Sequence, residues 1–304
     1  MLNLQSLLPW RGYRLDPARA LAARRDFDER RGYRDYWNLC RGKLARAVPA
    51  GDDDLSRSGV EKLRLFAEEE ATAILRDVIA RARGVVASDK GIDYSEVLAF
   101  DDSGFLAGIF ERTLRPEIDA KLVRYFGSEY FIYSYSVTRA LPEKESRRSF
   151  LWHCDRGPRA FLKILLYLNA TEEHGGTTEF LDRDSTAEFE RIGYVFGPNR
   201  RRQADLAPLA RRFGVAYAPI RWSVRAGEAL IFEPSNVLHR GVLPSRGARY
   251  VLSLMLAASP VPWREAFRRT RPTGFCERNE GVWLESAGEL LAITGAVPTA
   301  PAGA

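Results

Sequence analysis

Two of the three histidines in the chain stand where their side chains could bind a metal ion. His153 and Asp155 form a His-x-Asp motif, and residues i and i+2 of a strand point to the same face. His239 follows a strand-like segment at Ala229–Glu233. Two imidazoles and one carboxylate are a ligand set typical of non-haem Fe(II) sites, in which further coordination positions stay open. A His-x-Asp pair alone is more often a surface or hydrogen-bonded pair.

An arginine inside an apolar strand-like run is a second candidate group. Arg249 comes ten residues after His239, within the run Gly247–Leu254. A buried arginine is costly unless it pairs with an anion, and its planar fork matches a carboxylate. Arg240 and Arg246 compete for this role, but one adjoins His239 and the other falls in a turn, so we expect both to be solvated. The pattern indicates an anion site beside a metal site.

The third histidine and the cysteines carry weaker signals. His174 lies in the polar, glycine-rich segment Glu172–Gly176. We expect a solvated loop histidine there, with a metal ligand as the alternative. The three cysteines are odd in number and far apart, so they form neither a disulfide framework nor a zinc motif: Cys40, Cys154 and Cys276.

The elements that must position these residues show two periodicities. Apolar residues at steps of three to four predict helices over 17–31, 60–83 and 114–126, with Ser58 and Glu61 as a capping box for the second helix. From Tyr130 onward, short β-branched and aromatic runs predict strands at 130–138, 161–169, 177–181, 192–196, 215–220, 229–233 and 249–256. This order favours a mainly β fold, a sandwich or barrel with a helical N-terminal layer.

The order of the motifs resembles that of a known family. The His-x-Asp motif is followed by a series of further matches: Tyr167-Leu168-Asn169, Gly175-Gly176, the run Ala226–Phe232, His239 and Arg249. In this order, residues 130–256 are similar to the double-stranded β-helix core, a cupin-like jelly roll, of the Fe(II)/2-oxoglutarate-dependent dioxygenases. The similarity extends to both the phytanoyl-CoA dioxygenase-like and the prolyl-hydroxylase-like branches. It implies Fe(II) as cofactor and 2-oxoglutarate and O2 as co-substrates.

The resemblance also implies the reaction. His153, Asp155 and His239 would bind Fe(II), and Arg249 would pair with the distal carboxylate of 2-oxoglutarate. Oxidation of 2-oxoglutarate to succinate and CO2 would accompany hydroxylation of an unactivated C–H bond in a small-molecule substrate, which could be anionic. Related halogenases have a small residue in place of the carboxylate, so Asp155 favours hydroxylation, while desaturation and cyclisation stay open.

Three further residues are candidates for binding the co-substrate. Tyr167 and, from a weaker match, Tyr135 would contact the distal carboxylate, with ordinary packing as the alternative for both. Strand parity places Lys163 on the same face as Tyr167, where it could neutralise the co-substrate or the substrate, or instead extend to solvent at an edge. Phytanoyl-CoA dioxygenase-like members often carry a hydroxyl group two positions after the distal histidine, where this chain has Gly241.

We expect one catalytic domain over residues 1–304. Residues 1–127 form a mainly helical N-terminal region that buttresses the core, 128–258 form the double-stranded β-helix, and 259–304 form a C-terminal cap and tail. The core carries an arginine-rich insertion at 182–225, which includes Asn199–Gln203. This insertion is either a lid that recognises an anion or a solvated loop.

Composition limits the remaining classes of protein and of binding partner. The 304 residues are 45% hydrophobic and 28% charged, as in globular proteins, without the apolar run of about 18 residues that a membrane helix needs. Residues 1–10 lack the pattern of a signal peptide, which favours a cytoplasmic protein. The net charge of +6 comes from scattered arginines, so an arginine-rich background explains it as well as anion binding does. We expect neither nucleic acid nor membrane as a partner and predict no oligomeric state.

Two other functions stay open at this stage. One is a hydroxylase of peptide or protein side chains, which the prolyl-hydroxylase-like strand and the basic charge favour. The other is a non-catalytic β-barrel that binds an anion or nucleic acid through its arginines. The second function predicts that His153, Asp155 and His239 can be replaced without loss of function.

Overall fold

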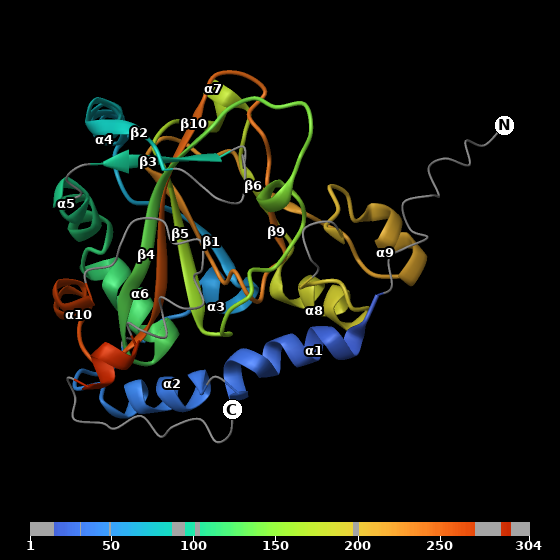
Figure 1. Cartoon of the computed structure of the whole chain (residues 1–304), viewed down its shortest axis with the longest axis horizontal. Coiled ribbons are helices and arrows are strands. Elements are labelled where there is room, and N and C mark those ends of the chain that lie inside the picture. Colours follow the sequence, from blue (N-terminus) through green and yellow to red (C-terminus); the bar gives the residue numbers. More distant parts are fainter. Residues whose placement is uncertain are drawn as a thin grey trace.

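The computed structural model describes residues 15–30, 32–48, 50–86, 95–100, 104–196, 201–270 and 287–292. In these ranges the chain forms two antiparallel sheets with helices outside them (Figure 1). No helix among them is long and apolar enough to cross a membrane. Cys276 and the tail at 293–304 lie outside the described residues.

The β core consists of a larger and a smaller sheet. The larger sheet has seven strands in the order β1-β8-β5-β10-β4-β3-β2, and the smaller has three in the order β7-β6-β9. The strands are β1 (Val60–Arg64), β2 (Ala82–Val85), β3 (Ser95–Phe100), β4 (Glu129–Ala140), β5 (Phe161–Tyr167), β6 (Thr178–Phe180), β7 (Ile220–Arg221), β8 (Glu228–Phe232), β9 (His239–Gly241) and β10 (Arg249–Ser259). The two sheets confirm the predicted β core of the jelly-roll class.

The larger sheet buries apolar side chains on both faces. On β5 and β8, Ile164 and Ile231 belong to the cluster that faces the helices. Tyr167 and Phe232 point to the other face because side chains alternate along a strand. There the ring of Phe180 from β6 lies 4.9 Å from that of Phe232. The alternation therefore decides which residues can reach the space between the sheets.

Helices cover the outside of both sheets. In Figure 1, α5, α6 and α10 lie on one side of β4, and α8 and α9 lie on the far side of β9. The helices are α1 (Pro17–Arg25), α2 (Tyr33–Gly42), α3 (Asp54–Ser58), α4 (Glu68–Arg81), α5 (Gly104–Thr113), α6 (Pro116–Phe126), α7 (Thr171–His174), α8 (Arg183–Arg191), α9 (Ala207–Phe213) and α10 (Trp263–Thr270). A π-helical turn spans Asp26–Arg30 and a 3-10 turn spans Arg148–Phe150.

Aromatic side chains hold α2 against the core. The Tyr33 hydroxyl donates to the carbonyl of Ala160 at 2.7 Å, and the Tyr36 hydroxyl donates to that of Ala258 at 2.8 Å. Both rings are buried, so each tyrosine removes apolar area from water while its hydroxyl group keeps a hydrogen bond. These contacts therefore fasten α2 to the β core.

The N-terminal region also supplies strands, where the sequence predicted mainly helices. Residues 60–64 form β1, which pairs with β8, and the helix begins only at Glu68. The predicted helix over 60–83 and its capping box are therefore wrong at their start. Gly59 ends α3 with a φ of 79°, which starts the chain in a new direction, and Val60 is then buried against the sheet. Pairing with β8 overrides the local helical pattern.

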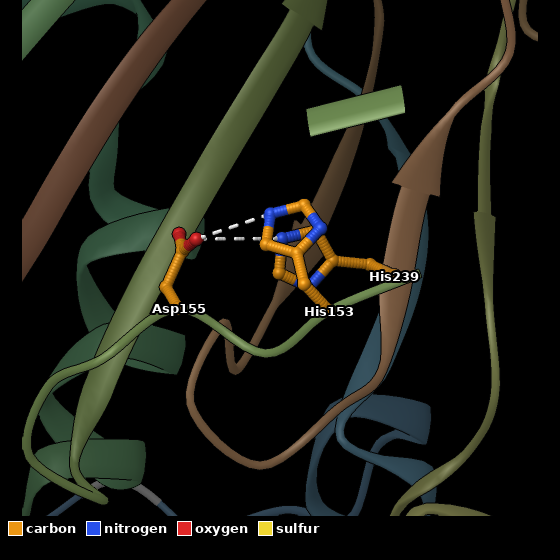
Figure 2. Close-up of side chains that lie close together, drawn as sticks. All are labelled: His153, Asp155 and His239. Atoms are coloured by element: carbon orange, nitrogen blue, oxygen red, sulfur yellow. Dashed lines mark ion pairs between the residues drawn. The ribbon is translucent and has the colours of Figure 1, made fainter. Parts of the chain in front are cut away.

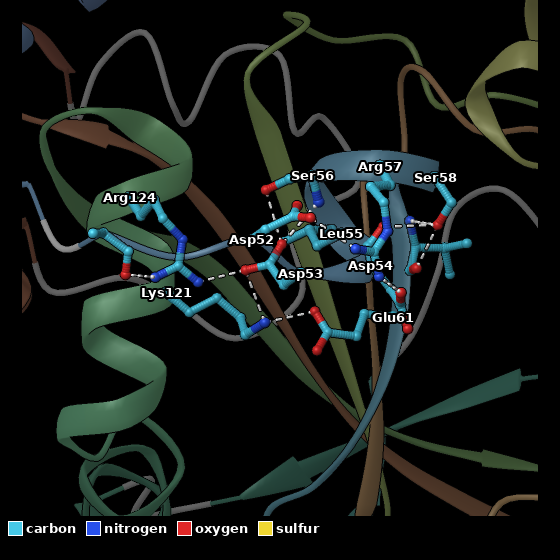
Figure 3. A network of polar contacts seen from close by, with 12 residues as sticks. Asp52, Asp53, Asp54, Leu55, Ser56, Arg57, Ser58, Glu61, Lys121 and Arg124 are labelled. Carbon is cyan, nitrogen blue, oxygen red and sulfur yellow. Dashed lines mark hydrogen bonds and ion pairs between the residues drawn. The ribbon is translucent and has the colours of Figure 1, made fainter.

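An ion-pair network fastens this strand to the helical layer (Figure 3). Asp53 caps α3 by accepting from the backbone N–H of Ser56 at 2.9 Å. The same carboxylate pairs with Arg124 and Lys121 of α6, and Lys121 also reaches Glu61 of β1 at 2.7 Å. Burial raises the pKa of the Asp53 carboxyl, but these partners outweigh burial and hold that pKa below its usual range.

Two predicted strands are wrong or displaced. Residues 192–196 form no strand, although the carbonyl of Val195 accepts from the N–H of Cys154 at 3.1 Å. Of the strand predicted at 215–220, only Ile220 is in β7. At 194–196 buried apolar residues pack in a loop, and at 215–217 partly buried ones do, so these hydrophobic runs did not indicate strand pairing.

Candidate metal site and adjoining anion site

The structure brings the three predicted metal ligands together. One ligand atom from each of His153, Asp155 and His239 lies within 4.8 Å of the others. Figure 2 shows both imidazoles directed at the carboxylate. Asp155 Oδ1 is 3.4 Å from Nε2 of His153 and 3.8 Å from Nε2 of His239. The imidazole ring centroids are 4.4 Å apart.

Backbone pairing brings these distant segments into register. His153 and His239 form an isolated antiparallel bridge in which each N–H donates to the other residue's carbonyl, at 3.0 and 2.9 Å. Residues paired in this way carry their side chains on the same face of the sheet. The N–H of Asp155 donates to the carbonyl of Pro234 at 2.8 Å. The carboxylate is thus fixed to the segment that leads into the distal histidine.

Each imidazole is oriented through its second nitrogen. Nδ1 of His153 donates to the carbonyl of Leu151 at 2.7 Å, and Nδ1 of His239 donates to that of Val237 at 2.9 Å. Both neutral rings therefore turn the lone pair of Nε2 toward Asp155, which is the form that binds a metal. Burial lowers the pKa of His153 and of His239, which favours the neutral ring.

Lys163 contacts the carboxylate of the triad. Its Nζ lies 2.7 Å from Oδ2 of Asp155, while Oδ1 faces the two imidazoles. Burial raises the pKa of Asp155, but the nearby Lys163 and the histidines outweigh it and hold that pKa well below its ordinary value. Lys163 was a candidate for neutralising the co-substrate or the substrate, or for extending to solvent, and its ionic partner in the structure is a triad residue.

Arg249 forms a buried cationic site at the start of β10. Nη1 donates to the carbonyls of Thr177 at 2.7 Å and Val242 at 3.2 Å. The guanidinium carbon lies 5.5 Å from the ring centroid of Phe150. Its Nε is buried and makes no hydrogen bond to any residue that the structure describes. A buried N–H of a guanidinium without a partner in the protein could donate a hydrogen bond to a bound anionic ligand.

The two candidate tyrosines have different positions. The Tyr167 hydroxyl lies beside the Arg249 guanidinium and is 3.0 Å from Oγ1 of Thr178. Tyr135 instead packs in the helix-facing core, with its ring centroid 5.0 Å from that of Phe110. It pairs with Leu254, whose side chain points to the same helix-facing side. Strand parity therefore excludes Tyr135 from the space between the sheets, which corrects its candidacy.

His174 is buried, contrary to the expected solvated loop. It is 1% exposed, and its Nδ1 accepts from the N–H of Gly176 at 3.0 Å. Burial, followed by the nearby charge of Arg249, lowers the pKa of His174 to about 4. Arg240 also differs from expectation, since it is partly buried and pairs with Glu179 at 2.7 Å, whereas Arg246 is exposed as expected. Polar local sequence predicted exposure, whereas loop packing excluded water.

The arginine-rich insertion brings a positive charge close to the triad. Trp152 and Gln203 form an isolated antiparallel bridge, which places Arg202 across from His153. The positive charge of Arg202 contributes to lowering the pKa of His153, after burial and against the effect of Asp155. Arg200 lies outside the described residues. The hypothesis of an anion-recognising lid stays a prediction.

Comparisons with known proteins give only distant similarities. No protein-family model and no curated protein matches the chain. Among solved structures, EctD from S. alaskensis with 2-oxoglutarate and 5-hydroxyectoine aligns at 16% identity and a TM-score of 0.47, covering 71% of this chain and 82% of that chain. The epimerase SnoN in complex with Fe3+, alpha ketoglutarate and nogalamycin RO aligns at 12% identity and a TM-score of 0.47, covering 74% of this chain and 85% of that chain.

A third solved structure is HygX from Streptomyces hygroscopicus with nickel and 2-oxoglutarate bound. It aligns at 15% identity and a TM-score of 0.43, covering 67% of this chain and 84% of that chain. Because the TM-scores of all three lie below 0.5, the geometry of this chain's own site has to support any function.

Proposed function

We propose that the chain is an Fe(II)- and 2-oxoglutarate-dependent dioxygenase that hydroxylates an unactivated C–H bond of a small molecule. The observation that carries the proposal is the His153–Asp155–His239 cluster, whose ligand atoms lie within 4.8 Å of one another. Two neutral imidazoles and one carboxylate on one face suit Fe(II) and leave positions open. The bound metal and co-substrate would supply the oxidising chemistry, with succinate and CO2 as co-products.

The residues of the chain would bind and orient the reactants. His153, Asp155 and His239 hold the metal. Arg249 offers its buried Nε to the distal carboxylate of 2-oxoglutarate, and the Tyr167 hydroxyl adjoins the same guanidinium. Arg249 is 7% exposed, so water competes little for this ion pair.

The proximity of further positive charge supports an anionic group on the substrate. Arg202 lies across from His153 and influences its pKa, and its side chain is half-buried. A cation at the edge of a site attracts carboxylate- or phosphate-bearing molecules. We therefore favour a small anionic substrate over a peptide, and parallel screening of both classes for succinate release would separate them.

The experiment that tests this function uses a charge-transfer band. Purified protein is mixed anaerobically with Fe(II) and 2-oxoglutarate, and the visible metal-to-ligand band is recorded. We expect the band in the wild type, its loss in His153→Ala and its weakening in Arg249→Ala. A folded wild-type protein that binds Fe(II) but shows no band would contradict the proposal and would favour the non-catalytic anion-binding barrel.

A further inference from the structure

The two carboxylate oxygens of Asp155 have different neighbours. Oδ1 lies 3.4 Å from Nε2 of His153 and faces the space where the triad converges. Oδ2 accepts a hydrogen bond from Nζ of Lys163 at 2.7 Å. We propose that Lys163 is a positioning residue that occupies Oδ2, so that Asp155 presents a metal ion with one oxygen rather than two.

The lysine is held in place by the sheet. On β5 it pairs in register with Phe232 of β8, and its Nζ lies 5.8 Å from the centroid of the Phe232 ring. The same ring contacts the imidazole of His239 edge to face, at a centroid distance of 4.8 Å. Phe232 thus supports the ammonium group and the distal histidine together. Its negative ring face favours a cation at this place.

The arrangement has a consequence for the coordination of a metal, and this step rests on the proposed function. Three single-atom ligands on one face leave three positions of an octahedral ion open. A co-substrate that chelates through two atoms and a molecule of O2 need all three. If Asp155 bound through both oxygens, it would occupy one of these positions. Lys163 keeps that position open by competing for Oδ2.

The matched variants separate the lysine's charge from its donor. Lys163→Met removes both and Lys163→Arg retains both. Lys163→Gln removes the charge but keeps an N–H donor, and it is also the second neutral variant if the methionine variant does not fold. Lys62→Met is the control, because Lys62 lies in the same sheet but pairs with Glu228 at 3.4 Å, which is not a triad residue. Circular dichroism establishes that each variant is folded.

Co(II) alone is the first probe, and 2-oxoglutarate is added second. We expect Lys163→Met to alter the visible Co(II) absorption, because Asp155 then binds through both oxygens. We expect the affinity of the Co(II)-loaded variant for 2-oxoglutarate to fall by at least about tenfold. Lys163→Arg should restore the spectrum and most of the affinity, and Lys62→Met should match the wild type in both.

Each alternative outcome has a distinct meaning. An unchanged Co(II) spectrum in Lys163→Met overturns the inference, and weak 2-oxoglutarate binding beside it would make Lys163 a direct contact of the co-substrate. A wild type that binds Co(II) but not 2-oxoglutarate contradicts the dioxygenase function, while the spectra still decide the role of Lys163. A wild type that binds no Co(II) contradicts both.

Discussion

The side chains of the candidate metal site are oriented by contacts within the protein itself. Backbone carbonyls of Leu151 and Val237 accept from Nδ1 of the two histidines, and Lys163 contacts Asp155. Such second contacts fix the ring tautomer and direct the binding atoms inward. A metal therefore meets a prepared set of atoms, and less conformational entropy is lost on binding.

Gly241 shows how closely the anion site is packed. A Cβ on this residue would lie 2.7 Å from Cδ1 of Phe150, whose ring lies against the guanidinium of Arg249. We expect Gly241→Ala to destabilise the fold by about 1–3 kcal/mol because the aromatic ring must shift. We also expect weaker 2-oxoglutarate binding, although no contact residue is removed, and titration calorimetry of the Co(II)-loaded protein measures this.

The control for this change is Gly108→Ala. A Cβ on Gly108 meets no atom within 4 Å, and the residue lies within α5, so alanine should be neutral or slightly stabilising. Equal effects of the two substitutions on 2-oxoglutarate affinity would contradict a special role for the space at Gly241.

At the level of elements, one carboxylate joins α3, α6 and β1. Asp53 accepts a hydrogen bond from a backbone N–H of α3 and forms ion pairs with Lys121 and Arg124 of α6. Lys121 also pairs with Glu61 of β1. We expect Asp53→Asn to lower the free energy of unfolding by about 1–3 kcal/mol near neutral pH. Asparagine keeps the helix cap, so the change isolates the ion pairs.

The pH dependence of this effect has a defined sign. Because the ion pairs depress the pKa of Asp53 in the folded protein, the stabilisation is present above the ordinary aspartate pKa of about 3.9. It is lost as the pH falls toward the depressed value. Urea unfolding of wild type and variant at pH 7 and pH 3 should therefore show a smaller difference at the lower pH. Asp54→Asn, at an exposed carboxylate, is the control, and a pH-independent difference would contradict the argument.

At the scale of the whole molecule, the triad joins the loop before β5 to the smaller sheet. His153 and Asp155 precede β5, and His239 begins β9. A metal bound to all three links the loop before β5 to β9 and binds only the folded chain. Ligands of this kind stabilise the fold by mass action.

Metal binding should therefore raise the thermal midpoint. At a hundredfold excess of Co(II) over its Kd, we expect a stabilisation of about 2.7 kcal/mol and a rise of about 5 °C. Excess EDTA should reverse the rise, and His239→Ala should abolish it. Differential scanning calorimetry at one scan rate measures each case. The same rise in His239→Ala would show that Co(II) binds elsewhere.

Local sequence was enough to predict the clustering of His153, Asp155 and His239 and the class of fold. The His-x-Asp spacing requires only strand alternation to place His153 and Asp155 together, and an arginine within an apolar run is costly without an anion. The short runs after Tyr130 predicted the β core because their period differs from that of helices. These features depend on neighbours along the chain, so no long-range contact was needed to identify them.

The remaining assignments depended on contacts between distant residues. Pairing with β8 turned residues 60–64 from a predicted helix start into a strand, and loop packing buried His174. Strand parity in the assembled sheet directs Tyr135 toward the helical layer. The folded loop before β5 places Asp155 within ion-pair distance of Lys163. Local periodicity leaves such choices nearly equal in free energy, and the burial and hydrogen bonds made between far-apart segments separate them.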